Sequence, residues 1–189
     1  MPRCPLGLLA ASLATFAAGV GLALAAHDLF AFDRSDTPPR ADLDVVRRAQ
    51  VIAMDELPDA AIAVFDSVNP KIYLNTRLLA QIGPDLAAFL RAHEEGHLAY
   101  HHVPERRFGL VRVETPAPVL HSYEFAADCY AAQVLRRERP ASVHAAIRFF
   151  QKRRDLVTDS AHPSMGARAD QLIDCLTDPD RSLRIVHRR

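Results

Sequence analysis

The chain has 189 residues, of which 49% are hydrophobic and 24% are charged, and its 23 basic side chains balance 23 acidic ones. This length and composition predict one globular domain with a single sizeable core. The balanced charge gives no reason to expect nucleic acid as a partner. Basic residues gather only in residues 181–189, which we expect to form a solvated tail.

Residues 1–26 have the pattern of a targeting segment. Arg3 precedes an apolar run over residues 5–26, and Ala23-Leu24-Ala25 matches the small-x-small pattern of a signal-peptide cleavage site. The same run is long enough to be retained as a membrane anchor. Both interpretations predict an exported domain, periplasmic or extracellular, and the second attaches it to the membrane.

Cys129 and Cys175 are the only cysteines outside the targeting segment. In an oxidising compartment such a pair favours a disulfide. The alternative is two small buried thiols, which protein cores often contain.

Residues 27–41 predict a linker, and the domain is expected over residues 42–180. Asp42 can cap a helix that continues with helical apolar spacing to Ala53. Residues 60–66 and 71–75 predict two short strands. We expect the second of these to be a sheet edge on which an extended peptide can pair.

Pro84 and Asp85 begin a predicted helix whose apolar stripe runs through His93 and His97 to Tyr100. Residues 103–119 predict a loop broken by prolines, with a strand candidate at 109–113. Three further helices are expected to start at caps provided by serines, which are Ser122, Ser142 and Ser164. Tyr100, His101 and His102 are expected to form the frayed, wet end of the helix. The few strands and about five helices predict an α+β domain.

The most informative motif is His93-Glu94-Glu95-Gly96-His97, which has the HExxH pattern of zinc hydrolases. Two histidines four residues apart lie on the same face of a helix and can reach one metal ion. The glutamate after the first histidine can activate a water on that ion. A catalytic zinc site also needs a third protein ligand. His101 lies about 12 Å along the helix axis from His93, too far to share the ion. The metzincin pattern is excluded because it requires Gly and His at positions occupied here by Tyr100 and Val103.

Glu124 is the better candidate for the third ligand. Glu124 and Asp128 are four residues apart and share a helix face with Ala127, Ala131 and Leu135. Acids on an apolar face are costly to bury unless they meet a cation or hydrogen-bond donors. A zinc ion on Glu124 and a hydrogen bond from a ligand histidine to Asp128 would meet both needs. The alternative is an acidic residue favoured by the helix dipole and a surface aspartate.

This pattern of His93-Glu94-x-x-His97 followed by Glu124-x-x-x-Asp128 resembles the gluzincin clan of zinc peptidases. More narrowly, residues 85–100, residues 124–128 and His162-Pro163-Ser164 with Arg168 resemble the CAAX-prenyl-endopeptidase family, which includes membrane and periplasmic quality-control proteases. The resemblance spans about residues 60–176. It implies a zincin-like α+β domain with a small sheet, an HExxH helix and a second helix that carries the glutamate.

The resemblance also implies one Zn2+ per chain, bound by His93, His97 and Glu124, with Glu94 as the general base. It further places His162 beside the metal, where it would polarise the substrate carbonyl or stabilise the oxyanion. Tyr123 and His121 are the alternative candidates for the oxyanion donor. The expected reaction is hydrolysis of a peptide bond in a peptide or protein by a zinc-activated water.

The chain departs from the family at several points. Glu95 is a second acid where the family usually has an uncharged residue, and the connection from His97 to Glu124 is short. The multi-pass membrane helices of the prenyl endopeptidases are also missing, so prenylated substrates do not follow from the resemblance. Two alternatives stay open, namely a non-catalytic exported zinc module and a structural or interaction domain in which the motif is fortuitous. Closed four-ligand coordination, with His121 or His162 as the fourth ligand, would favour the zinc module.

Overall fold

The computed structural model describes residues 40–66, 68–102, 105–108 and 111–178. The predicted targeting segment, nearly all of the linker and the basic tail lie outside these residues. Within the described ranges, none of the helices combines the length and apolar character that a membrane span requires.

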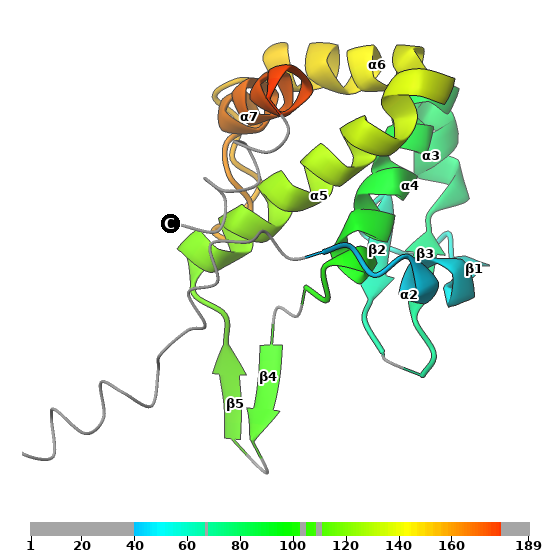
Figure 1. Ribbon diagram of the computed structural model, residues 1–189, viewed down its shortest axis with the longest axis vertical. Helices are drawn as coiled ribbons and strands as arrows, with labels where there is room; N and C mark the ends of the chain where they lie inside the picture. Colours follow the sequence, from blue (N-terminus) through cyan, green and yellow to red (C-terminus); the bar gives the residue numbers. More distant parts are fainter. Residues whose placement is uncertain (1–39, 67, 103–104, 109–110, 179–189) are drawn as a thin grey trace, which may run out of the picture. The chain divides into compact units, whose positions relative to one another are not determined.

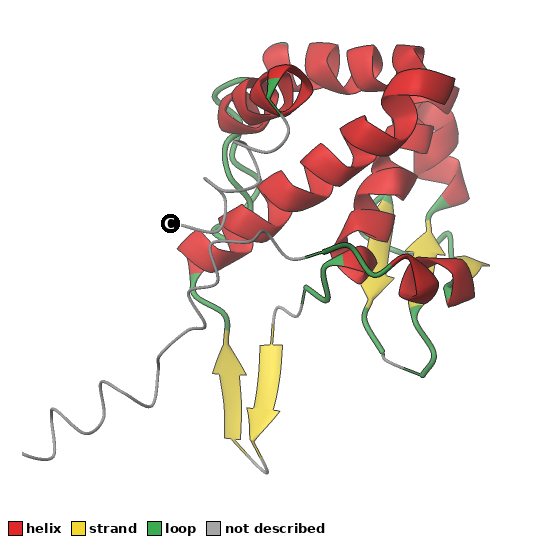
Figure 2. Cartoon of the chain, in the orientation of Figure 1, coloured by secondary structure: helices red, strands yellow, loops and turns green. Residues whose placement is uncertain are grey.

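The domain is of the α+β class, as predicted, and Figure 1 labels its elements along the chain. Its strands form two small sheets, and its helices make up most of the remainder (Figure 2). The elements are α2 (Leu43–Arg48), β1 (Gln50–Ala53), β2 (Ala61–Val64), β3 (Lys71–Leu74), α3 (Thr76–Ile82), α4 (Pro84–Ala99), β4 (Glu105–Phe108), β5 (Val111–Glu114), α5 (Ala117–Glu138), α6 (Pro140–Gln151) and α7 (Met165–Thr177). The finer assignment to a zincin-like fold stays a prediction.

The main sheet has the strand order β1-β3-β2, with β1 parallel and β2 antiparallel to β3. The prediction that residues 71–75 form a sheet edge is therefore wrong. Lys71–Leu74 is the central strand, and among the described residues the edges are β1 and β2. Of these two edges, β2 is the one that contacts α4 and could pair with an extended peptide.

The predicted helix from Asp42 to Ala53 is correct only in its first half. Asp42 caps α2 by accepting hydrogen bonds from the backbone N–H groups of Asp44 and Val45, and α2 ends at Arg48. Gln50–Ala53 is strand β1, paired in register with Lys71–Leu74. The β-branched residues in this segment favour a strand once a partner strand is present.

Helix α4 packs on both sides. On one side it shares a core with α5, α6 and α7, and on the other it meets the sheet and α2 through Leu98, Ile72 and Val45. The larger core consists of buried apolar side chains from four helices, namely Leu86, Phe89, Ala92, Ala131, Ala132, Leu135, Val143, Ala146, Phe150, Met165, Ala169 and Leu172. Burial on both sides fixes the position of α4, which carries the HExxH motif.

Within residues 105–108 and 111–119, the chain has more regular structure than expected. β4 and β5 form an antiparallel hairpin in this region, and α5 begins at Ala117 rather than after Ser122. Pro116 and Pro118 do not break this helix, because the first turn of a helix has no need for their N–H groups. Ser122 lies inside α5, where its hydroxyl donates to the carbonyl of Val119. Ser142 also lies inside its helix, since α6 starts at Pro140.

The close crossing of α4 and α5 depends on Gly96 of the HExxH motif. A Cβ at position 96 would lie 2.9 Å from Cα and 3.1 Å from the carbonyl oxygen of Ala127. Two small residues therefore let the helix backbones approach, in agreement with the small residues predicted on that face of α5. This approach brings Glu124 on α5 towards the two histidines on α4.

Helix α7 is tied to α5 by a disulfide between Cys129 and Cys175, whose Cα atoms lie 5.6 Å apart. The preferred prediction for this pair is confirmed. Ser164 caps α7 as expected by accepting from the N–H of Ala167, and Leu172 is buried. Ile173, expected in the core stripe, is 37% exposed.

Candidate metal centre

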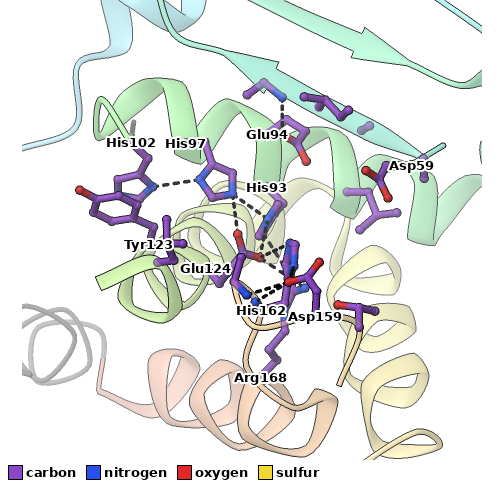
Figure 3. A pocket seen from close by; sticks show the side chains of 18 of the residues that line it. Asp59, His93, Glu94, His97, His102, Tyr123, Glu124, Asp159, His162 and Arg168 are labelled. Carbon is purple, nitrogen blue, oxygen red and sulfur yellow. Dashed lines mark hydrogen bonds and ion pairs between the residues drawn. The ribbon is translucent and has the colours of Figure 1, made fainter. Parts of the chain in front are cut away.

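Three side chains from α4 and α5 converge on one point. His93 Nε2 and His97 Nε2 lie 3.0 Å apart, and Glu124 Oε2 and Oε1 lie 3.4 Å and 3.2 Å from them respectively (Figure 3). Among the described residues, this is the one group of three metal-ligating side chains close enough to hold an ion. The residues predicted as zinc ligands are therefore brought together by the fold.

The geometry of this triangle suits a tetrahedral ion. Ligand atoms about 2.0–2.2 Å from a tetrahedral ion lie about 3.3–3.6 Å from one another, close to the separations found here. Glu124 Oε2 supports this fit, because it is buried and makes no hydrogen bond within the described residues. Such an oxygen is costly unless a cation meets it. The set of two imidazoles and one carboxylate is typical of catalytic zinc sites.

The charges of the ligand set also favour a cation. Burial would raise the pKa of Glu124, but His93 and then His97 hold the pKa of this carboxyl well below its ordinary value. Burial opposes protonation of His93, yet Glu124 and then Asp128 outweigh it and raise its pKa to about 10. In the metal-free protein, protonated His93 and the guanidinium of Arg168, whose Nη1 lies 3.5 Å from Glu124 Oε2, thus supply the positive charge that the two buried carboxylates require.

His93 is held from behind by Asp128. His93 Nδ1 lies 2.8 Å from Asp128 Oδ1, so Nδ1–H donates to the carboxylate and Nε2 faces Glu124. This is the contact with a ligand histidine that we expect for Asp128 from the sequence. The second partner of Asp128, which the sequence does not predict, is Arg168, a buried residue that donates to both carboxylate oxygens.

His97 is held from behind by His102, a residue predicted to lie at the wet end of the helix. His102 is 8% exposed, and its Nδ1 lies 3.0 Å from His97 Nδ1. The expectation of a frayed, wet end is therefore wrong at position 102. His101 is exposed, as expected, but it pairs with Asp42 and is not frayed. A spacing of five residues does not share a helix face, so no periodic signal identifies His102.

Glu94 lines the same cavity as the ligands and points towards strand β2 (Figure 3). Its Oε2 accepts a hydrogen bond of 2.6 Å from the backbone N–H of Ala63 in β2. The candidate general base is therefore held by the same edge strand that lines the cavity over the ligands.

His162 lies in the loop between α6 and α7, with its Nε2 3.9 Å from Glu124 Oε2. Asp159 accepts from His162 Nδ1 at 2.8 Å, and this hydrogen bond lowers the pKa of Asp159. His162 stands next to the ligand triangle, as expected, but does not belong to the group that could hold the ion.

His121 and Tyr123, the alternative candidates for the oxyanion donor, make contacts away from the ligand triangle. His121 Nε2 bonds to the carbonyl of Ser160 at 3.1 Å, which anchors the α6–α7 loop. The Tyr123 ring stacks on His102 with a centroid distance of 4.1 Å (Figure 3). Neither contact directs its polar atom at the ligand triangle.

A cavity of about 450 Å³ opens over the site. Its walls come from β2, from α4 and from the α6–α7 loop, with Leu90 and Met165 among the apolar lining and Asp59 and Thr158 among the polar lining. The cavity reaches His93, His97 and Glu124, so a ligand inside it could approach the metal position.

Comparison of the chain with models of known protein families, with curated proteins and with solved structures finds no match.

Proposed function

We propose that this chain is an exported, zinc-dependent metalloendopeptidase. The observation that carries the proposal is the triangle of His93, His97 and Glu124 at the floor of an open cavity, with Glu94 beside it. A structural zinc site needs four closed protein ligands and no base, whereas a catalytic site leaves one position open. His121 and His162, the candidate fourth ligands, lie outside the triangle, which favours the enzyme over a non-catalytic zinc module.

The zinc ion, when bound, would lower the pKa of a water to about 7 and polarise the substrate carbonyl. In this proposal, Glu94 would take a proton from the attacking water and deliver it to the leaving nitrogen. Its Oε2 is held by the N–H of Ala63, which limits rotation of the side chain.

In its doubly protonated form, which donates from both ring nitrogens, His162 would be the donor that meets the negative charge developing on the carbonyl oxygen. Asp159 holds its Nδ1, which directs Nε2 towards the ligand triangle. A donor preorganised in this way stabilises the charge without having to reorganise during the reaction.

The strand β2 is the surface on which an extended substrate would pair. The N–H of Ala63 points away from β3, and the backbone groups of Ala61, two residues earlier, share that side. Main-chain pairing of this kind binds many sequences and leaves the choice between them to pockets for alternate side chains.

The proposal is tested by incubating the purified full chain, loaded with zinc, with a mixed peptide library and identifying new termini by mass spectrometry. Glu94→Gln is the matched variant, because it keeps all three ligands and removes the base. We expect cleavage by the parent and a loss of at least about a hundredfold in the variant at equal zinc content. Equal cleavage by both proteins would contradict the role of Glu94, and no cleavage by the zinc-loaded parent would leave the zinc module as the better account.

A further inference from the structure

We infer that His102 is a positioning residue for the metal centre, whose Nδ1 accepts a hydrogen bond from His97 and fixes that ligand's tautomer. The inference rests on the metal site within the proposed function, but not on peptide hydrolysis.

The tautomer follows from the ligand triangle. His97 Nε2 points at Glu124 and His93, so its lone pair must remain available for the ion. A neutral imidazole carries its proton on the other nitrogen, which places N–H at His97 Nδ1. The partner of that nitrogen is His102 Nδ1 at 3.0 Å, which must then be the acceptor.

His102 is itself held in place by packing. Its ring is nearly parallel to that of Tyr123, with an interplanar angle of 10° and a centroid distance of 4.1 Å, and it is 8% exposed (Figure 3). The centroid of the Tyr100 ring lies 5.7 Å from that of His102. An acceptor locked in this way can restrict the orientation of the His97 ring.

A left-handed turn at the end of α4 places His102 beside His97. Helix α4 ends at Ala99, and His101 takes a φ of 54°, the left-handed conformation that residues other than glycine seldom adopt. This turn folds the chain back, so that the N–H of His102 reaches the carbonyl of His97 at 3.0 Å. The N–H of His101 also donates to the carbonyl of Leu98, and these two bonds form the Schellman motif with which helices commonly end, here with histidine in place of the usual glycine.

Asp42 supplies the contacts that enforce the turn. Its N–H donates to the carbonyl of Ala99 at 2.8 Å, and its carboxylate lies 3.1 Å from Nε2 of His101. The turn at His101 is thus fixed by a segment far away in the sequence.

The two histidine ligands therefore have different outer partners. His93 donates to the buried carboxylate of Asp128, and His97 donates to an imidazole. Outer partners of ligand histidines orient the ring, and their loss typically weakens metal binding about 10–100-fold. The acceptor and the aromatic ring of His102 can be tested separately, because different substitutions preserve each of them.

The test compares His102→Asn and His102→Phe in the full chain. In His102→Asn, the side-chain amide oxygen can replace the Nδ1 acceptor, but the ring is lost. In His102→Phe, the stack on Tyr123 is kept and the acceptor is lost. Zinc dissociation constants are measured by competition with a chromophoric chelator, and thermal unfolding of the metal-free proteins reports folding. His102→Leu, which also lacks the acceptor, replaces His102→Phe if the latter does not fold.

We expect His102→Phe to bind zinc about 10–100-fold more weakly than the parent and His102→Asn to bind nearly as tightly as the parent. Tight binding by His102→Phe, or equally weak binding by both variants, would overturn the role as acceptor. A parent that binds no zinc would overturn this inference and the proposed function together. A parent that binds zinc but cleaves no peptide would contradict only the proposed function.

Discussion

Arg168 on α7 donates to both carboxylate oxygens of Asp128 on α5, from Nε to Oδ2 at 2.8 Å and from Nη2 to Oδ1 at 2.7 Å. Both residues are buried, and the guanidinium also lies over the ring of Phe150. Burial would raise the pKa of Asp128, but Arg168 and then His93 outweigh it and hold the pKa below its ordinary value. The carboxylate that supports His93 is therefore kept charged by α7.

Removing Arg168 should leave that charge buried without its main partner. We expect Arg168→Met to lower the free energy of unfolding by about 3–5 kcal/mol, measured by urea denaturation. The matched control is Arg154→Met. Arg154 also makes a two-bond pair with an aspartate, Asp170, but both side chains are about half exposed. Arg154→Met should lower the free energy of unfolding by at most about 1 kcal/mol. Equal losses of unfolding free energy in Arg168→Met and Arg154→Met would contradict this account.

Gly96→Ala should disturb the crossing of α4 and α5. The added Cβ would meet backbone atoms of Ala127, which cannot move aside as a flexible side chain can. Overpacking of this kind costs about 1–3 kcal/mol, and we expect weaker zinc binding as well because Glu124 would move from the histidines. Urea denaturation and chelator competition measure the two effects. Glu95→Ala, next to it in the motif, serves as the control, since its pair with Arg91 is partly exposed. If Gly96→Ala behaves like this control, the close approach is not required.

Ala63→Pro should impair Glu94 without breaking β2. The N–H that proline removes donates to Glu94 rather than to β3, and proline is tolerated on such edge positions. A hydrogen bond to a charged group contributes about 1.5–3 kcal/mol, so we expect kcat to fall about 10–100-fold at unchanged zinc content.

Ala61→Pro is the control for the loss at Ala63. Its N–H lies on the same side of β2 but does not contact Glu94, so substrate pairing and KM should change more than kcat. Steady-state kinetics on one cleaved peptide separates the two parameters. A fall in kcat of the same size in both variants would contradict a specific role of the Ala63 N–H in positioning Glu94.

The disulfide between Cys129 and Cys175 should stabilise the domain, because it closes a loop over a sequence separation of 46 residues. The chain-entropy relation gives roughly 4 kcal/mol for a loop of that length. We expect the double variant Cys129→Ala/Cys175→Ala to unfold at correspondingly lower urea concentration. Addition of a reductant to the parent should have a similar effect, and a change below about 1 kcal/mol in both experiments would show that the loop is already restricted in the unfolded chain.

The parts of the site that could be predicted are those set by helical periodicity. His93 and His97 share a face of α4, and Glu124 and Asp128 share a face of α5, so each pair follows from spacing alone. The contacts of Arg168 and His102 depend instead on how α7 packs and on a left-handed turn at His101. Such contacts leave no periodic signal in the sequence, so neither role can be predicted from it.

The error in the sheet has a specific origin. Residues 50–53 continue the apolar spacing of α2, so the spacing predicts a helix there, and without β1 the strand at residues 71–74 has the position of an edge. Pairing with a distant strand overrides local propensity in short segments. The same limitation affects α5, where Pro116 and Pro118 are typical of breaks in a helix although they occupy its start.

The central claim is that His93, His97 and Glu124 bind one catalytic zinc ion. Its most direct test is the zinc content of the purified full chain, measured by plasma mass spectrometry beside a Glu124→Ala variant of equal foldedness. We predict close to one zinc per chain in the parent and much less in the variant after dialysis. A folded parent that holds no zinc even after reconstitution would contradict the account.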